Sequence, residues 1–287
     1  MKAGLLPKLL FSPSVILVLI CVYGYIMFTV YLSFTSSTML PTTDFVGGVA
    51  YERLMGLDNW WVSVKNLAIF AGLYILVAMA LGLGLAILMD QRIRAETLFR
   101  SVFLYPMALS FIVTGTAWKW LLDPGVGLER SLHVLGWESF SFSWIKDSEL
   151  AIYCVVIAAV WQTSGFVMAM FLAGLRGIDG EIMKAAQIDG ATTFQLYRRI
   201  VIPLLRPIFL SAFIVLAHLA IKSYDLVVAL TSGGPGGSAW LPSNFMYEYT
   251  FKRNEMAVGS ASAVIMLMTI VAIIVPYLYS ELREKPR

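Results

Sequence analysis

The sequence contains little charge and little cysteine. Only 14% of its 287 residues are charged, whereas a soluble domain carries about 25%. The formal net charge is +3, without a basic block, and this excludes a nucleic-acid-binding surface. The two cysteines, Cys21 and Cys154, are too few for a disulfide scaffold and form no C-x-x-C pair. A chain this apolar is not intrinsically disordered either.

The sequence also lacks the common motifs of ATP binding and metal catalysis. The dipeptide Gly-Lys does not occur, so the chain has no phosphate loop of the form G-x-x-x-x-G-K-[ST]. Its two histidines, His133 and His218, are too far apart in sequence to suggest a metal-ligand pair, and no H-E-x-x-H occurs. We therefore predict no catalytic site, no metal site and no cofactor in this chain.

Long apolar runs are what the sequence has in abundance, with 59% of its residues hydrophobic. Six runs are long enough to cross about 30 Å of hydrocarbon, which takes about 20 helical residues. None alternates as the strands of a membrane barrel do. The sequence thus predicts an all-α membrane protein with a single transmembrane domain over residues 1–287. The six spans are expected at 14–34, 66–89, 101–122, 150–175, 207–230 and 256–280.

The distribution of Lys and Arg predicts the orientation of these spans. If the N-terminus lies in the cytoplasm, the cytoplasmic segments hold 13 basic residues and the opposite loops hold 6. Because cytoplasmic loops carry the excess of positive charge, both termini are expected in the cytoplasm. The first apolar run is far longer than the core of a signal peptide, so we expect an uncleaved anchor.

The cytoplasmic segment 176–206 is patterned as folded structure and not as a linker. Residues 181–188 (EIMKAAQI) favour a helix, and Asp189-Gly190 supplies a stop that tolerates positive φ. Thr192 or Thr193 can cap a second short helix that extends to Ile200. The pattern predicts a helix, a glycine turn and another helix. Spacing alone does not decide whether this hairpin packs on the bundle or is presented to a partner.

This segment resembles the EAA loop of the permeases of binding-protein-dependent ABC importers. The family pattern is E-A-A-x-x-x-G-x(9)-I-x-L-P, and here Lys184 replaces the Glu while Ile202 replaces the Leu. The matching residues are Ala185, Ala186, Gly190, Ile200 and Pro203, with Asp189 preceding the glycine. The segments 230–235 (LTSGGP) and 259–263 (GSASA) resemble the carbohydrate, maltose-permease-like branch. Over nearly the whole chain the sequence is similar to glucose/mannose-type permeases of Gram-negative bacteria.

The resemblance implies the architecture of a type I ABC importer permease in the bacterial inner membrane. It also implies four partners within the lipid bilayer or beside it: a second homologous permease, two ATPase subunits and a periplasmic sugar-binding protein. ATP and Mg²⁺ would be bound by the ATPases. The loop would dock on an ATPase through Lys184, Ala185, Ala186, Asp189, Gly190, Ile200 and Pro203.

Polar groups inside the spans are candidates for the transport path, because ionisable residues are costly there. His218, Lys222 and Asp225 have the i, i+4, i+7 spacing of one helix face in the fifth span. Lys222 and Asp225 either neutralise one another as a structural pair or line the path and bind sugar hydroxyls. Trp161, Gln162 and Tyr224 offer the aromatic face and the amide that a pyranose prefers.

Two further features of the spans have simpler interpretations. The segment Trp118-Lys119-Trp120 is typical of an interfacial aromatic belt with a snorkelling lysine. Pro106 is expected to kink the third span. The alternative function is an ion- or proton-coupled secondary transporter with His218, Lys222 and Asp225 as its relay. That alternative leaves the EAA-like loop unexplained.

Overall fold

A computed structural model of the protein describes residues 5–91 and 93–283. Throughout these two ranges the regular elements are helices, and the only β-structure is an isolated bridge between Thr35 and Phe45. The prediction of an all-α membrane protein is confirmed. Four helices are long and apolar enough to cross a membrane, or up to six if each of two bent helix pairs forms one span.

The chain divides into two compact units, which are described separately. Unit 1 comprises residues 1–61 and 245–269, and unit 2 comprises residues 62–244 and 270–287. Unit 1 contains α1 (Leu5–Val18), the π-helical turn Leu19–Gly24, α2 (Tyr25–Leu32), α3 (Val49–Met55), the π-helical turn Glu248–Lys252 and the first half of α15 (Met256–Arg283). In the apolar window of Phe11–Leu32 only 6% of the residues are buried, so this helix has few neighbours within the chain.

The segment that follows α2 is joined to the start of α15 by hydrogen bonds. The backbone N–H groups of Met256 and Ala257 donate to the carbonyl oxygens of Thr38 and Ser37, at 3.3 and 3.0 Å. These bonds connect the two sequence segments of unit 1, residues 1–61 and 245–269, to each other.

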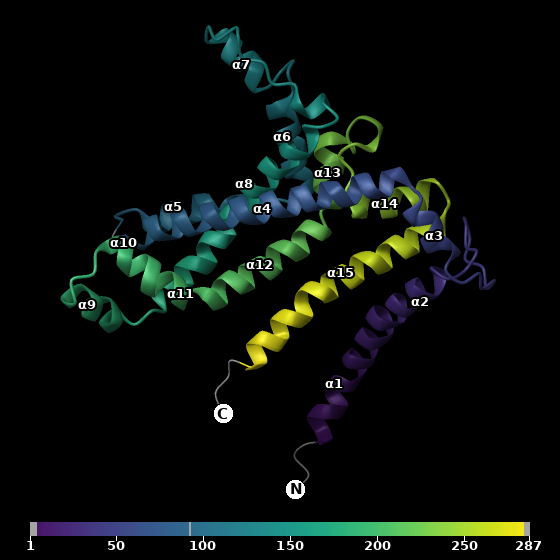
Figure 1. Ribbon diagram of the computed structural model, residues 1–287, viewed down its shortest axis with the longest axis horizontal. Coiled ribbons are helices and arrows are strands. Elements are labelled where there is room, and N and C mark those ends of the chain that lie inside the picture. Colours follow the sequence, from purple (N-terminus) through teal and green to yellow (C-terminus); the bar gives the residue numbers. More distant parts are fainter. Residues whose placement is uncertain (1–4, 92, 284–287) are drawn as a thin grey trace. The chain divides into compact units, whose positions relative to one another are not determined.

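Unit 2 is built around α8 (Ala151–Arg176), the most buried candidate span, with 67% of its apolar window covered. Its burial follows from its sequence, because no charged residue occurs between Glu149 and Arg176 and small residues admit close neighbours. Other elements of unit 2 are α4 (Asp58–Asp90), α5 (Glu96–Leu104), the 3₁₀ turn Tyr105–Ala108, α6 (Phe111–Leu122), α7 (Leu128–Val134), α12 (Arg206–Ile221), α13 (Tyr224–Thr231) and α14 (Pro242–Tyr247), the last of which begins in unit 2. Figure 1 shows this order along the chain.

The third predicted span, 101–122, is not one continuous helix. The stretch Glu96–Ala108 and the helix Phe111–Leu122 form an angle of 99°. Pro106 lies in the 3₁₀ turn, and the break follows at Leu109, whose ψ of 144° is extended. Ser110 then caps α6, because its hydroxyl accepts from the N–H of Val113 at 3.3 Å. The expected kink is therefore a full break between two short helices.

The fifth predicted span, 207–230, is wrong as a single helix. Helix α12 ends at Ile221, and Ser223, with φ −73° and ψ 61°, separates it from α13. The bent pair of suitable length and composition is instead Thr193–Leu204 with Arg206–Ile221, at 63°. His218 and Asp225 consequently lie on different helices, with Lys222 between them, and the predicted common helix face does not exist.

Candidate coupling loop and transport path

The loop between α8 and α12 folds as the sequence predicts. Helix α9 (Gly180–Ile188) begins after Asp179, whose carboxylate accepts from the N–H of Glu181 at 2.9 Å. Gly190 has a φ of +79°, which favours glycine, and turns the chain. Thr192 and Gln195 then form a reciprocal capping box at the start of α10 (Thr193–Leu196). The helix, glycine turn and second helix are confirmed as local structure.

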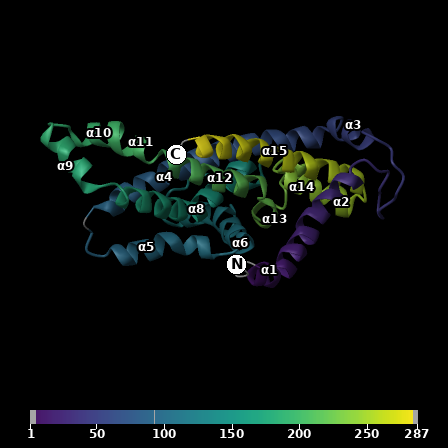
Figure 2. The same ribbon diagram turned by 90° about the horizontal axis from the view of Figure 1, so that it is seen from below.

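The outer surface of this loop has no partner within the part of the chain that the structure describes. Ala186 is buried against the core, whereas Ile188 is 86% exposed and Phe194 is 71% exposed. A Cβ built at Gly190 would meet nothing within 4 Å. Figures 1 and 2 show α9, α10 and α11 (Ile202–Leu204) grouped at one end of unit 2, away from α13. The loop therefore presents large apolar side chains that a neighbouring protein could cover.

A small charge network holds the base of the loop. Arg176, the last residue of α8, approaches Glu96 at 2.9 Å and Asp90 at 3.8 Å. Glu96 also binds Arg100 at 2.8 Å on its own helix. The network thus connects the end of α8 to the end of α4 and the start of α5.

Two adjacent candidates for the transport path face different surroundings. Trp161 is 40% exposed, and its ring packs edge-to-face on Trp118 of α6, with centroids 5.8 Å apart. Gln162 is only 1% exposed, and its Nε2 donates to the carbonyl oxygen of Leu109 at 2.8 Å. The prediction that Gln162 offers its amide to a sugar therefore does not fit this structure, because the amide nitrogen already donates a hydrogen bond to the backbone at the break in the third span.

The remaining path candidates surround the break between α12 and α13. Lys222 and Asp225 are both exposed, and no ion pair joins these two described residues. Tyr224 is half-buried at the first position of α13, and its carbonyl oxygen accepts from Nδ2 of Asn244 at 3.4 Å. Of the two roles that the sequence left open for Lys222 and Asp225, the mutual pair is absent from this conformation.

Trp118 is the residue that sequence reasoning placed elsewhere. Its position beside Lys119 and Trp120 suggested an interfacial belt, yet its ring contacts Trp161. The sequence signal that could have distinguished Trp118 from Trp120 is helical spacing, because the exposed Trp120 lies two positions further along and therefore on another face of α6. Assigning Trp118 to a contact with α8 and not to the interfacial belt also requires knowing that α6 and α8 meet there.

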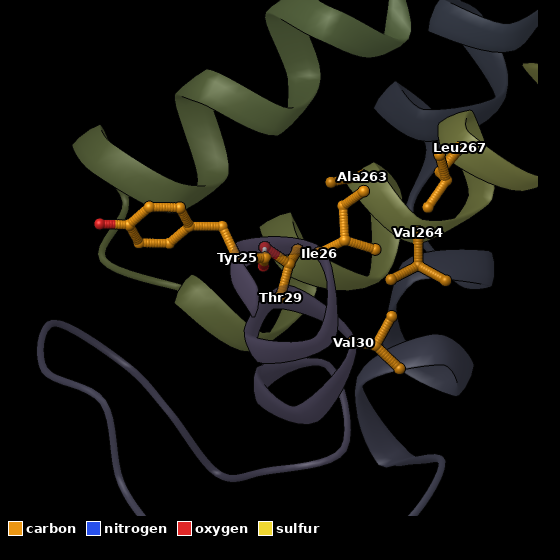
Figure 3. A pocket seen from close by; sticks show the side chains of 7 residues that line it. All are labelled: Tyr25, Ile26, Thr29, Val30, Ala263, Val264 and Leu267. Carbon is orange, nitrogen blue, oxygen red and sulfur yellow. Dashed lines mark hydrogen bonds between the residues drawn. The ribbon is translucent and has the colours of Figure 1, made fainter. Parts of the chain in front are cut away.

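A separate pocket of about 240 Å³ lies in unit 1 between α2 and α15 (Figure 3). Its lining is apolar apart from Thr29, and the Thr29 hydroxyl donates to the carbonyl oxygen of Tyr25 at 2.9 Å. A sugar would find no array of hydrogen-bonding side chains there. The lining comprises Tyr25, Ile26, Thr29, Val30, Ala263, Val264 and Leu267.

Comparison with known proteins identifies the family. Residues 9–284 match the family described as binding-protein-dependent transport system inner membrane component. The chain therefore belongs to this family of inner-membrane transport components. With several apolar helices, it is a multi-pass protein of that membrane.

Relatives and solved structures extend this similarity over the whole chain. A probable ABC transporter permease protein of Pyrococcus horikoshii is 40% identical over 277 residues, which cover 96% of this chain and 95% of the relative. The xylose/arabinose import permease protein of Haloferax volcanii is 32% identical, with 94% and 86% covered. A bacterial ABC transporter involved in the import of the acidic polysaccharide alginate has the same fold, with a TM-score of 0.84 at 17% identity and 99% and 98% covered.

Proposed function

We propose that this chain is the permease subunit of an ATP-driven sugar importer. The observation that carries the proposal is the full-length similarity to a permease named for xylose/arabinose import. The fold shared with an alginate importer is consistent with it. The sugar that we propose is glucose, mannose or a related sugar, on the basis of the resemblance to glucose/mannose-type permeases.

The proposed transport path passes the exposed Trp161, with Tyr224, Lys222 and Asp225 as further candidates. An indole face suits the apolar face of a pyranose ring, and exposed polar groups suit its hydroxyls. Gln162 is left out of this direct contact set because its amide is buried. A second homologous permease would complete the path, and a periplasmic sugar-binding protein would deliver the sugar.

The proposed role of the loop 176–206 is to dock on an ATPase subunit. Lys184, Ala185, Asp189 and Gly190 are exposed on it, together with the apolar residues Ile188 and Phe194. Small residues permit close approach, and the apolar side chains gain from being covered. Ala186 is buried and Ile200 is half-buried, so these two support the loop, whereas Pro203 is exposed and belongs to the proposed docking surface. Two ATPase subunits would bind ATP and Mg²⁺ and move the loop, which we place in the cytoplasm with both chain termini.

The ion-coupled alternative receives less support. Its relay needs His218, Lys222 and Asp225 in sequence along one face, but the helix ends at Ile221. His218 contacts a narrow crevice lined with isoleucines, including Ile214 and Ile270, and this is an apolar environment. A proton relay needs polar neighbours for each step.

Uptake of radiolabelled glucose, mannose, xylose and maltose by cells tests the proposal. The strains compared are the parent, a strain without this chain, and a strain whose partner ATPase lacks its phosphate-loop lysine. We expect uptake of one hexose to be lost in both altered strains. Uptake that is lost without this chain but persists with the ATPase disabled would instead establish the ion-coupled alternative, and unchanged uptake of all four sugars in both strains would exclude these substrates.

A further inference from the structure

The break between α5 and α6 receives a hydrogen bond from a buried amide of α8. Leu109 has extended backbone angles there, and its carbonyl oxygen accepts from Nε2 of Gln162 at 2.8 Å. Inside a membrane no water is available for a carbonyl that leaves the helical pattern, so a side-chain donor is needed. Gln162 is 1% exposed, which makes this donor inaccessible to solvent and to sugar.

The orientation of the amide follows from its surroundings. If the amide were flipped, the Gln162 carbonyl oxygen would face that of Leu109, and two acceptors would repel each other. In the observed orientation the Gln162 Oε1 is buried without a hydrogen-bond partner. The bond to the Leu109 carbonyl oxygen is therefore the hydrogen bond that compensates for burying this amide.

The same face of α8 is shaped to receive α5. A Cβ built at Gly165, three residues after Gln162, would collide with the carbonyl group of Phe103. Gln162 and Gly165 thus lie on one helix face, and both meet backbone of the third span, one by a hydrogen bond and the other by close contact. These two residues of α8 therefore contact the backbone of the third span on either side of Pro106 and fix its course there.

The break determines where Trp118 lies. Trp118 is on α6, nine residues after Leu109, and its ring packs at 70° on Trp161, which precedes Gln162 on α8. A change in the angle between α5 and α6 would carry Trp118 away from Trp161. We expect the geometry of this indole pair to depend on this hydrogen bond together with the close packing of Gly115 in α6 on Leu226 and Ala229 in α13.

We propose that Gln162 is a positioning residue for transport, which holds the Leu109 break and thereby sets Trp118 against Trp161. Gln162 touches no sugar and acts through the indole pair. The part of this proposal that concerns transport rests on the proposed function, whereas the part that concerns the break does not.

Spin-label distances in the purified full-length chain in lipid nanodiscs test the break directly. Labels are attached at Leu98→Cys on α5 and Trp120→Cys on α6, after Cys21→Ala and Cys154→Ala remove the native thiols. Leu98 and Trp120 are 64% and 67% exposed, so the labels need not disturb the core. We compare Gln162→Leu, which has no donor, and Gln162→Asn, which keeps the amide but is one methylene shorter.

Thr163→Val is the matched control. Thr163 is also a buried polar residue of α8, but its hydroxyl donates to the carbonyl oxygen of Ala159 in the same helix, at 2.9 Å, and its other polar neighbour is the Tyr74 hydroxyl of α4, which is not part of the third span. We expect a broader, shifted distance distribution in both Gln162 variants and an unchanged one in Thr163→Val. The initial rate of sugar uptake should fall about tenfold in the Gln162 variants, as one lost hydrogen bond to a buried carbonyl changes a two-state population by that order.

Three results would overturn the proposal. The first is an unchanged distance distribution in Gln162→Leu and Gln162→Asn. The second is full transport in spite of an altered distribution. The third is failure of both Gln162 variants to insert while Thr163→Val inserts, which would make the amide a folding element only. If the distribution changes as expected but the unsubstituted chain imports no sugar, the proposed function fails while the role of Gln162 at the break stands.

Discussion

Two glycines in neighbouring parts of unit 2 serve opposite purposes. At Gly165 a side chain would meet the backbone of Phe103, so the absent side chain lets one helix touch another. At Gly190 the surrounding space is open, but the φ of +79° favours glycine. The first glycine serves contacts within the chain and the second shapes a surface that faces outward. Helix α8 is thus specialised for internal packing and the loop after it for presentation.

Gly165→Ala should produce the largest effect, since it attacks the internal contact. Overpacking costs about 1–3 kcal/mol even where side chains can move aside, and here the obstacle is backbone. We expect the amount of protein in the membrane fraction to fall severalfold, as measured by immunoblot. Gly84→Ala is the control, because a Cβ there meets nothing within 4 Å. Equal levels of the two variants would show that α5 can move away from α8 without penalty.

Gly190→Asp should leave the membrane level nearly intact and reduce transport strongly. The positive φ imposes a strain of about 1 kcal/mol on any other residue, and the added carboxylate changes the exposed face of the loop. Gly180→Ala on α9, which is equally open but has no positive φ, should transport normally. Lys184→Glu should also be tolerated better than Gly190→Asp. If uptake fell equally in both, charge would matter in this loop as much as backbone shape.

Arg176→Ala should have an intermediate effect, because it disconnects the loop from α4 and α5 without altering either. Exposed ion pairs contribute about 0.2–1 kcal/mol each, so the chain should fold and insert. We expect transport to fall two- to fivefold. Glu96→Gln should also lower uptake, and combining it with Arg176→Ala should add little, because both substitutions break the same ion pair. Lys252→Ala, which removes a pair in unit 1, serves as the control. Fully additive effects of Arg176→Ala and Glu96→Gln would argue against the network.

Lys222→Met and Asp225→Asn should give the smallest effects, and these should be independent. The two side chains do not pair in this structure, so we expect the double variant to transport no better than either single variant. A double variant that transports better than either single variant would reveal a mutual pair in another state of the transport cycle. A double variant that folds but transports nothing would favour direct sugar contact.

Residue patterns predict the continuous parts of this fold well. The second, fourth and sixth spans have no charged residue over their lengths, and a continuous helix lies at each predicted position. The glycine turn at Gly190 and a cap at Thr192 or Thr193 were also predictable, because both depend on local backbone chemistry, and the structure places the cap at Thr192. Short-range signals of this kind are contained in the sequence itself.

The helix breaks and the side-chain contacts along the proposed transport path could not be predicted from residue patterns in this way. Pro106 indicated a kink, but the other residues before Leu109 are as apolar as those of a continuous span, so composition does not distinguish a kinked helix from a full break. The donor that makes the break possible lies 53 positions later, at Gln162. An isolated amide in an apolar run was the available signal, but whether it faces a ligand or a distant carbonyl is decided by tertiary packing.

The exposure of the first helical segment has a consequence for biogenesis. Only 6% of the apolar window within Phe11–Leu32 is covered by the rest of the chain. A helix whose side chains need no protein neighbours can reach a stable state in lipid alone, since its backbone hydrogen bonds are internal. This segment is therefore able to enter the bilayer as soon as it is synthesised, whereas α8 reaches its final environment only after α12 and α13 have followed.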